Sequence, residues 1–217
     1  VIINLRNQGF SKIVVNVHHF ASKIIDFLDS CDFGVEISVS DESDLLLDTG
    51  GALLHARDLL AADNEPFLIH NVDILSNADL ASLMQAHERN QKLETLSTLL
   101  VSDRKSSRKL IFSPDMDLRG WHNLSTNEFR PKEFIQSTND IELAFSGIHV
   151  MSPDMLGLME SRGMSGAFPI IDFLLGVASS GNASSIVRGE LVGDLELIDI
   201  GKPDTLAKAE SFPFGIG

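Results

Sequence analysis

The order of apolar and polar residues changes its period several times along this chain. Residues 13–17 form a continuous β-branched run, which is typical of a strand that is buried on both faces. Residues 20–28 then place apolar side chains at helical spacing, and residues 35–39 alternate as a strand does. The pattern predicts a strand–helix–strand unit whose two strands pair in parallel.

The same succession continues downstream. A helix is expected over residues 52–60 after a pair of glycines, and an apolar strand follows at residues 67–69. Asp79 is placed to cap a helix that runs to about Asn90, and residues 93–101 predict a further strand. Strands and helices that alternate in this way are typical of a doubly wound α/β sheet.

The second half of the chain interrupts this order and then resumes it. Two short strands around a turn at residues 113–117 predict a β-hairpin insertion. Beyond it, a helix is expected over 168–177, strands near 185–187 and over 195–200, and a last helix over 203–210. We therefore predict one α/β domain over residues 1–217, Rossmann-like and doubly wound, with a mostly parallel mixed sheet and a small β-hairpin insertion.

Charge and cysteine usage narrow the classes of partner. With 31 acidic and 17 basic residues the chain has a formal net charge of −14, so its mean field repels nucleic acid and anionic membranes. No apolar run approaches the length of about 18 residues that a membrane span needs. The single cysteine, Cys31, excludes an internal disulfide and a multi-cysteine zinc site. These features favour a cytoplasmic protein that binds neither nucleic acid nor membrane.

Paired glycines at the start of a predicted helix form the first candidate site. In Asp48-Thr49-Gly50-Gly51 the missing side chains let backbone N–H groups approach a flat or anionic ligand closely. An alternative interpretation is a tight loop whose glycines only satisfy a positive φ angle. The segment alone does not decide between the two.

Two acidic residues follow apolar strands, at the sheet edge where ligands bind in open α/β folds. Asp73 lies in His70-Asn71-Val72-Asp73, and Asp199 lies in Asp199-Ile200-Gly201-Lys202-Pro203. Mg²⁺ prefers carboxylate ligands, and two carboxylates from separate strand ends can flank one ion that neutralises charge at a reacting phosphorus. Taken alone, Asp73 is as compatible with a loop cap as with a metal ligand, and Asp199 is more typical of a helix cap.

Taken together and in this order, these segments resemble the sugar-phosphate nucleotidyltransferases, the pyrophosphorylases that make nucleoside-diphosphate sugars. The matching segments, which span nearly the whole chain, are Gln8-Gly9-Phe10 with Lys12–Asn16, Asp48–Gly51, Asn71–Asp73, Phe145–Ile148 and Asp199–Pro203. Within that family, Phe145–Ile148 and Gly166–Phe168 most resemble bacterial enzymes that act on N-acetylmuramic acid 1-phosphate or mannose 1-phosphate.

The resemblance implies a Mg²⁺-dependent transfer of a nucleotidyl group from a nucleoside triphosphate to a sugar 1-phosphate, with release of pyrophosphate, in cell-wall sugar metabolism. It assigns Asp73 and Asp199 to catalysis and to the metal. It assigns the nucleotide to Thr49, Gly50, Gly51 and Asn71, and the sugar to Gly147. Glu142 flanks this last segment and is a candidate acceptor for a sugar hydroxyl. Assembly into a homo-oligomer stays open.

The chain also departs from the family pattern. No segment matches the glycine-rich loop whose arginine and lysine clamp the triphosphate. Because Val1 begins inside the expected first long helix, we expect truncation or a disordered segment instead of a naturally inactive protein. Val72 replaces the usual glycine, and Lys202 the usual threonine. The alternative function is a catalytically inactive regulatory subunit of the same fold that binds nucleotide or sugar. A dinucleotide-dependent enzyme is disfavoured, because no G-x-G-x-x-G follows the first strand.

Overall fold

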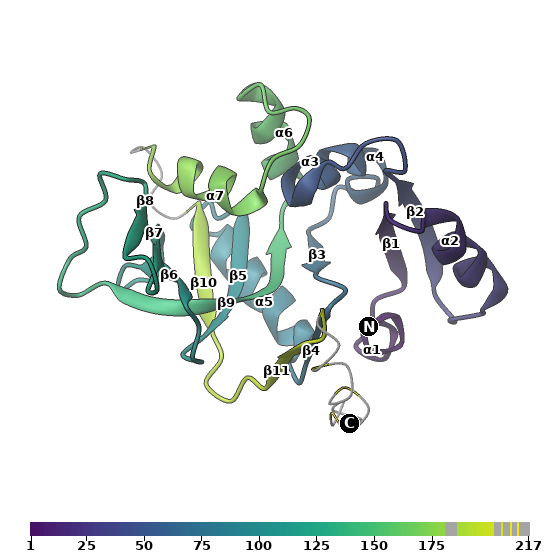
Figure 1. The fold of residues 1–217 in the computed structure, drawn as a ribbon, viewed down its shortest axis with the longest axis horizontal. Helices are drawn as coiled ribbons and strands as arrows, with labels where there is room; N and C mark the ends of the chain where they lie inside the picture. Colours follow the sequence, from purple (N-terminus) through teal and green to yellow (C-terminus); the bar gives the residue numbers. More distant parts are fainter. Residues whose placement is uncertain (181–185, 202–204, 206–208, 210–211, 213–217) are drawn as a thin grey trace. The chain divides into compact units, whose positions relative to one another are not determined.

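The computed structural model describes residues 1–180, 186–201, 205, 209 and 212, and it is a mixed α/β structure (Figure 1). The helices are α1 (Ile2–Asn7), α2 (Ala21–Ser30), α3 (Asp48–His55), α4 (Arg57–Leu60), α5 (Leu80–Gln91), α6 (Pro153–Ser161) and α7 (Ile170–Ala178). The strands are β1 (Lys12–Val17), β2 (Glu36–Asp41), β3 (Phe67–His70), β4 (Ile74–Ser76), β5 (Ser97–Ser102), β6 (Arg108–Phe112), β7 (Leu118–Asn123), β8 (Glu128–Arg130), β9 (Ile141–Met151), β10 (Val187–Leu191) and β11 (Leu197–Asp199). No helix in the described ranges is long and apolar enough to cross a membrane.

The elements fall into two compact units, each built from separate stretches of sequence. The central-sheet unit consists of Val1, Leu68–Met151 and Leu174–Gly217, and the N-terminal unit consists of Ile2–Phe67 and Ser152–Phe173. Each unit therefore needs segments that lie far apart in the chain to come together. The single domain over residues 1–217 stays a prediction.

The first strand–helix–strand unit is confirmed within the N-terminal unit. Strands β1 and β2 pair in parallel, with Lys12 opposite Glu36 and Val17 opposite Asp41, and α2 connects them. The predicted burial of β1 on both faces is wrong, because Val17 is its one fully buried residue. Among the described residues β1 pairs with β2 alone, and a sheet of two strands encloses little apolar surface.

A seven-stranded mixed sheet forms the centre of the other unit (Figure 1). Its order is β10-β5-β9-β6-β7-β8, and β3 also pairs with β9. The hairpin insertion is confirmed as β6 and β7, and β8 extends it. The sheet is less parallel than predicted: β10 and β5 are parallel, whereas β9 runs antiparallel to both β5 and β6. The reason is that the hairpin returns the chain to the sheet through β9 without a crossover helix.

Strand β9 carries an irregularity at its middle. Its pairing with β5 shifts between Leu99, which lies opposite His149, and Val101, which lies opposite Phe145. The Ser146 hydroxyl donates to the Leu100 carbonyl across this break (2.8 Å), and Gly147 takes a φ angle of +81°. A β-bulge of this kind redirects the backbone locally, and here it turns the Gly147 carbonyl toward the end of β3.

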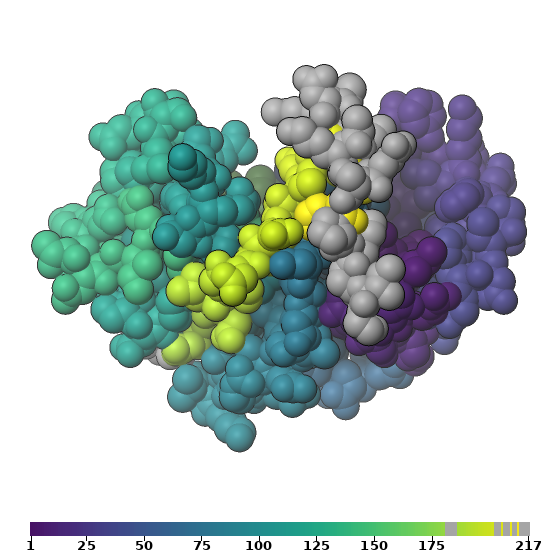
Figure 2. Space-filling model, turned by 90° about the horizontal axis from the view of Figure 1, so that it is seen from below, coloured from purple at the N-terminus to yellow at the C-terminus, as the bar shows by residue number. Residues whose placement is uncertain are grey.

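A short second sheet in the central-sheet unit holds the two strand ends that carry the candidate aspartates. Strands β4 and β11 are antiparallel, with Asp199 opposite Ile74. Figure 2 shows the yellow-green chain that leads from β10 into β11 lying against the blue part of the unit that includes β4. The helix expected over residues 203–210, and Lys202 before it, fall largely outside the described residues.

Helix α5 begins where the sequence predicted but delays the strand after it. Asp79 is the N-cap, and its carboxylate accepts a hydrogen bond from the Ser82 backbone (2.8 Å). Strand β5 begins at Ser97 instead of Leu93, because Glu94 has a φ angle of +64° and the Thr95 N–H still bonds to Asn90. Four residues of the predicted strand are therefore a helix exit and turn.

Candidate active site

The two aspartates expected to bind a metal lie side by side in the central-sheet unit. A Cβ atom placed on Gly201 would lie 3.1 Å from a carboxylate oxygen of Asp199 and 3.2 Å from one of Asp73. The backbone connects the same segments, because the Ile200 N–H donates to the Asp73 carbonyl (2.8 Å). The Gly201 N–H donates to the Asp199 carboxylate (2.9 Å). Both carboxylates thus converge on one small space that is open because residue 201 has no side chain.

The donor set in this space fits a hard divalent cation. Asp199 is exposed and Asp73 is half-buried, so both carboxylates are accessible to an ion. Within the described ranges no group of three or more His, Cys, Asp and Glu residues has metal-binding geometry. Mg²⁺ is commonly held by one or two carboxylates, with water and substrate phosphates as the remaining ligands, so two aspartates suffice for it.

Asn71 and Gly147 contact each other beside the aspartates. The Asn71 N–H donates to the Gly147 carbonyl (3.1 Å), and a Cβ atom on Gly147 would lie only 2.8 Å from the Asn71 side-chain nitrogen. Any larger residue at position 147 would therefore collide with Asn71, besides straining a φ angle of +81°. The bulge of β9 and the end of β3 thus bring together residues that the sequence assigned to the sugar and to the nucleotide.

The glycine pair lies in the N-terminal unit, inside the first turn of α3 and not before it. A Cβ atom on Gly50 would lie 2.2 Å from the Phe168 ring, and one on Gly51 would lie 2.2 Å from the Gly166 carbonyl. The positive-φ alternative is wrong for both glycines, since the residue with φ of +57° is Asp48. Glycine is needed at these positions for close packing against segment 166–168.

The hydrogen bonds of this loop are already made within the N-terminal unit. The Gly50 N–H donates to the Phe168 carbonyl (2.8 Å). The exposed Thr49 hydroxyl accepts from the Ile170 N–H (3.0 Å) at the start of α7. Contact of Thr49, Gly50 and Gly51 with a nucleobase stays a prediction, and it would use the surface of this packed loop rather than a free Gly50 N–H.

Glu42 is a residue of this loop whose position the sequence did not reveal. Its side chain is buried, and its carboxylate accepts a hydrogen bond from the Leu47 N–H (3.2 Å). The same carboxylate accepts a second hydrogen bond from the side-chain amide nitrogen of Asn16 (3.0 Å). The Glu42 N–H donates to the Val17 carbonyl (2.8 Å). Glu42 therefore fixes the turn that leads into Asp48. In the sequence Glu42 is one of three acidic residues close together, with Asp41 and Asp44, and nothing distinguishes it as the buried one.

Glu142 lies on β9 but is bonded toward the hairpin insertion. Its carboxylate accepts from His122 (2.8 Å) and from Gln136 (3.2 Å). The His122 ring stacks on Phe129 with centroids 4.0 Å apart. The predicted role of Glu142 as an acceptor for a sugar hydroxyl is not tested by these contacts, but a sugar would have to share a carboxylate that is already in use.

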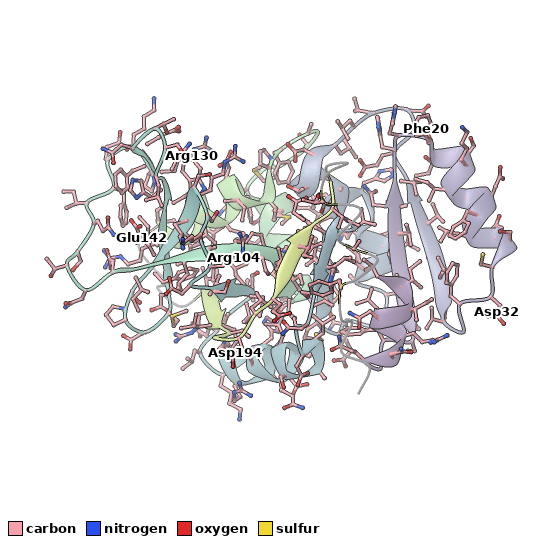
Figure 3. The ribbon with its side chains drawn as sticks, turned by 60° about the horizontal axis from the view of Figure 1, so that its bottom comes forward. Phe20, Asp32, Arg104, Arg130, Glu142 and Asp194 are labelled. Atoms are coloured by element: carbon pink, nitrogen blue, oxygen red, sulfur yellow. The ribbon has the colours of Figure 1, made fainter. Side chains whose placement is uncertain are left out.

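Arg104 is a second residue that the sequence did not single out. It follows β5 and is labelled in Figure 3. Its guanidinium donates from Nη2 to the Phe145 carbonyl (2.8 Å), two residues before Gly147. Burial lowers the pKa of Arg104, and the charge of the nearby Asp199 carboxylate acts in the opposite direction. A signal existed in the sequence, because a basic residue directly after a buried strand occupies the same kind of position as Asp73.

The mixed α/β fold of this chain is shared with solved structures of other proteins. The chain matches the structure of HddC from Yersinia pseudotuberculosis with a TM-score of 0.68 and 16% identity, covering 96% of this chain and 81% of that one. It matches the inositol-1-phosphate CTP transferase from T. maritima with a TM-score of 0.65 and 17% identity, covering 97% and 78%. At this identity the likeness concerns the fold, and it confirms the predicted α/β class.

The relatives found by sequence are named as sugar-phosphate nucleotidyltransferases. Mannose-1-phosphate guanyltransferase of Saccharomyces cerevisiae is 24% identical over 178 residues, and UTP–glucose-1-phosphate uridylyltransferase of Synechocystis sp. is 25% identical over 167 residues. The alignments cover 77% and 72% of this chain but 45% and 41% of the relatives, so the chain spans less than half of their length. No family model matches the chain. The predicted resemblance to sugar-phosphate nucleotidyltransferases is confirmed by these relatives.

Proposed function

We propose that this chain carries the metal and sugar-phosphate site of an enzyme that transfers a nucleotidyl group to a sugar 1-phosphate. A phosphate oxygen of the sugar 1-phosphate forms a bond to the α-phosphorus of a nucleoside triphosphate. The bond from that phosphorus to the bridging oxygen breaks, and pyrophosphate leaves. The nucleophile is already anionic at neutral pH, so the protein has to position two substrates and offset their charge instead of removing a proton.

The convergence of Asp73 and Asp199 on the space beside Gly201 is the observation that carries this proposal. Their carboxylate oxygens lie 3.2 Å and 3.1 Å from one common point, although the residues are far apart in sequence. Two acidic groups this close repel each other unless a cation or a proton lies between them. Asp73 and Asp199 would hold Mg²⁺ there, and the ion would supply positive charge to offset that of the substrate phosphates.

The neighbouring residues of the central-sheet unit suit the sugar phosphate. Gly147 is buried, and because it has no side chain Asn71 can lie directly against it. Asn71 itself is exposed, with a side chain that donates and accepts hydrogen bonds. Glu142, farther along the same strand, is assigned to a sugar hydroxyl. In the N-terminal unit, Thr49, Gly50 and Gly51 are assigned to the nucleobase by their resemblance to the base-contacting loop of the family.

The proposal is tested by pyrophosphate release from the product of the complete gene. Four nucleoside triphosphates are each combined with mannose, glucose, N-acetylglucosamine and N-acetylmuramic acid 1-phosphates, with Mg²⁺ and with EDTA. We expect one combination to release pyrophosphate in a Mg²⁺-dependent reaction. If nucleotide binds but no combination releases pyrophosphate, the regulatory-subunit alternative replaces the enzyme.

Replacement of Asp73 by Asn provides a sharper test of the metal assignment. Asp73→Asn should lower kcat/KM at least about a hundredfold, because a metal ligand is lost, while the free energy of unfolding changes by less than about 0.5 kcal/mol. Asp194→Asn is the matched control, since Asp194 is an exposed acid of the same unit and loses the same charge. Equal activities in the two variants would remove Asp73 from the site.

A further inference from the structure

Two enclosed basic side chains in the central-sheet unit have no carboxylate partner among the residues that the structure describes. Arg104 is half-buried and Lys109 is 8% exposed, in a chain with 31 acidic and 17 basic residues. Within the described part of the chain, each is hydrogen-bonded only to a backbone carbonyl, through Arg104 Nη2 to Phe145 and Lys109 Nζ to Arg104. Enclosed lysine and arginine side chains normally have an acidic partner. Two such cations without one among the described residues, in an acidic protein, favour binding of an anion there.

The guanidinium of Arg104 has unused donors. Its Nε–H is buried without an acceptor, which leaves a desolvated donor uncompensated. Its Nη1 also makes no hydrogen bond to the described residues. Unlike Nε, Nη1 is not among the buried atoms that lack a partner, so solvent and ligands can reach it. One side of the guanidinium fork is therefore anchored on β9, and another remains free to donate.

Arg104 is also placed beside the other candidate residues of this unit. Its anchor, Phe145, lies two residues before Gly147, whose carbonyl binds the Asn71 N–H. The charge of the Asp199 carboxylate acts on the guanidinium, and Asp199 shares the space beside Gly201 with Asp73. A phosphate that approached these carboxylates would meet the Arg104 cation, which forms no salt bridge with any acidic side chain in the described ranges.

We propose that Arg104 binds a phosphate group of the substrate in the central-sheet unit, and this assignment rests on the proposed nucleotidyl transfer. The phosphate belongs either to the sugar 1-phosphate or to the nucleoside triphosphate and its product pyrophosphate. Lys109 is a positioning residue: its ammonium group holds the Arg104 carbonyl at 2.7 Å and thereby fixes the start of the arginine side chain.

Steady-state kinetics of Arg104→Gln distinguish the two phosphates. We expect the KM for one substrate to rise about tenfold or more, which corresponds to about 1.4 kcal/mol of binding free energy, while the KM for the other changes less than twofold. A rise for the sugar 1-phosphate assigns the arginine to that substrate, and a rise for the triphosphate assigns it to the nucleotide. Arg108→Gln is the matched control, because Arg108 is an exposed arginine four residues away. Unchanged KM values for both substrates would overturn the proposal.

Calorimetric binding of pyrophosphate and of inorganic phosphate tests Arg104 independently of turnover. The wild-type protein should bind pyrophosphate at least about tenfold more tightly than Arg104→Gln does, with Arg108→Gln equal to wild type. If the wild type releases no pyrophosphate in any substrate combination but this difference persists, the nucleotidyl transfer fails and the anion site stands. If Arg104→Gln binds both anions as the wild type does, the anion site fails by itself.

The positioning role of Lys109 is tested by non-additivity. Lys109→Met should raise the same KM as Arg104→Gln does, but it should have almost no further effect in the Arg104→Gln background, because both changes remove one interaction. Unfolding in urea is measured in parallel so that a loss of stability is separated from a loss of affinity. Effects on KM that multiply in the double variant would show that Lys109 does not act through Arg104.

Discussion

At the scale of single residues, the glycine at position 147 is constrained in two independent ways. It combines a φ angle of +81° with a space in which a Cβ atom would lie 2.8 Å from Asn71. The first property costs any other residue about 1–2 kcal/mol, and the second forces the Asn71 side chain to move. The bulge in β9 therefore depends on glycine for backbone conformation and for close approach.

Gly147→Ala should both destabilise the protein and weaken the sugar-phosphate site. We expect the free energy of unfolding in urea to fall by about 1–3 kcal/mol and the KM for the sugar 1-phosphate to rise. Gly157→Ala is the control, since Gly157 lies in α6 with nothing within 4 Å of its Cβ position and should gain up to about 1 kcal/mol. A Gly147→Ala protein with wild-type stability and KM would contradict this account of the bulge.

At the scale of elements, helix α5 shows how far local sequence signals reach. Its N-cap, Asp79, was predicted from residue type and position, and Leu80, Leu83 and Ala86 form its buried face. The strand after it was placed four residues too early, because apolar residues from Leu93 onward are compatible with a turn as well as with a strand. A continuous apolar run specifies burial better than it specifies an element boundary.

Removal of the α5 cap should have a moderate cost. Asp79→Ala leaves the Ser82 N–H without its acceptor, so the free energy of unfolding should fall by about 1 kcal/mol. Asp79→Asn retains an acceptor oxygen and should lose less than half of that amount. The comparison is made by urea unfolding at pH 7, and equal losses in the two variants would show that the carboxylate charge matters and not the cap hydrogen bond.

At the same scale, the direction of the strands in the central sheet was predicted less well than their existence. The alternation of strands and helices indicated a mostly parallel sheet, but β9 is antiparallel to β5 and β6 and is, with 11 residues, the longest of the described strands. Strand direction depends on which strands meet in space, and no local pattern within residues 141–151 records that. The mixed α/β class was predictable, whereas the share of antiparallel pairing was not.

At the scale of the whole molecule, two buried histidines make stability depend on pH. Burial lowers the pKa of both His87 and His149 to about 4 from 6.5. Well above pH 6.5 both histidine side chains are neutral in the folded and in the unfolded state. As the pH falls below 6.5 the unfolded state takes up protons first, so stability is lost progressively until the folded pKa near 4 is reached.

Unfolding in urea at pH 7 and at pH 5 tests this dependence. The free energy of unfolding should be lower at pH 5 by about 2 kcal/mol for each of the two histidines. His149→Leu should reduce the loss by about half, and because both ring nitrogens of His149 are buried without a partner among the described residues it should also raise stability at pH 7. Equal stability of the wild type at both pH values would contradict the buried neutral state.

The candidate site was predictable to the extent that its residues stand at strand ends or in recognisable segments. Asp73 and Asp199 were selected because each follows an apolar strand, and their convergence beside Gly201 agrees with the expectation that they face each other. Glu42 escaped notice because a single acidic residue in a polar loop has no periodicity. Arg104 stands after a buried strand, as Asp73 does, but its residue type does not reveal that it is enclosed. Their enclosure is a property of neighbours that lie elsewhere in the chain.

The sequence by itself determined the α/β class, most of the elements, the acidic character, and the segments that resemble sugar-phosphate nucleotidyltransferases. These properties depend on residue types and on spacings within short windows. Tertiary structure alone decided that segment 166–168 packs against Gly50 and Gly51, that a bulge in β9 brings Gly147 to Asn71, and that Arg104 lies near Asp199. The physical reason is that each of these contacts joins residues separated by dozens of positions. Such contacts form only when packing and strand pairing bring distant segments together.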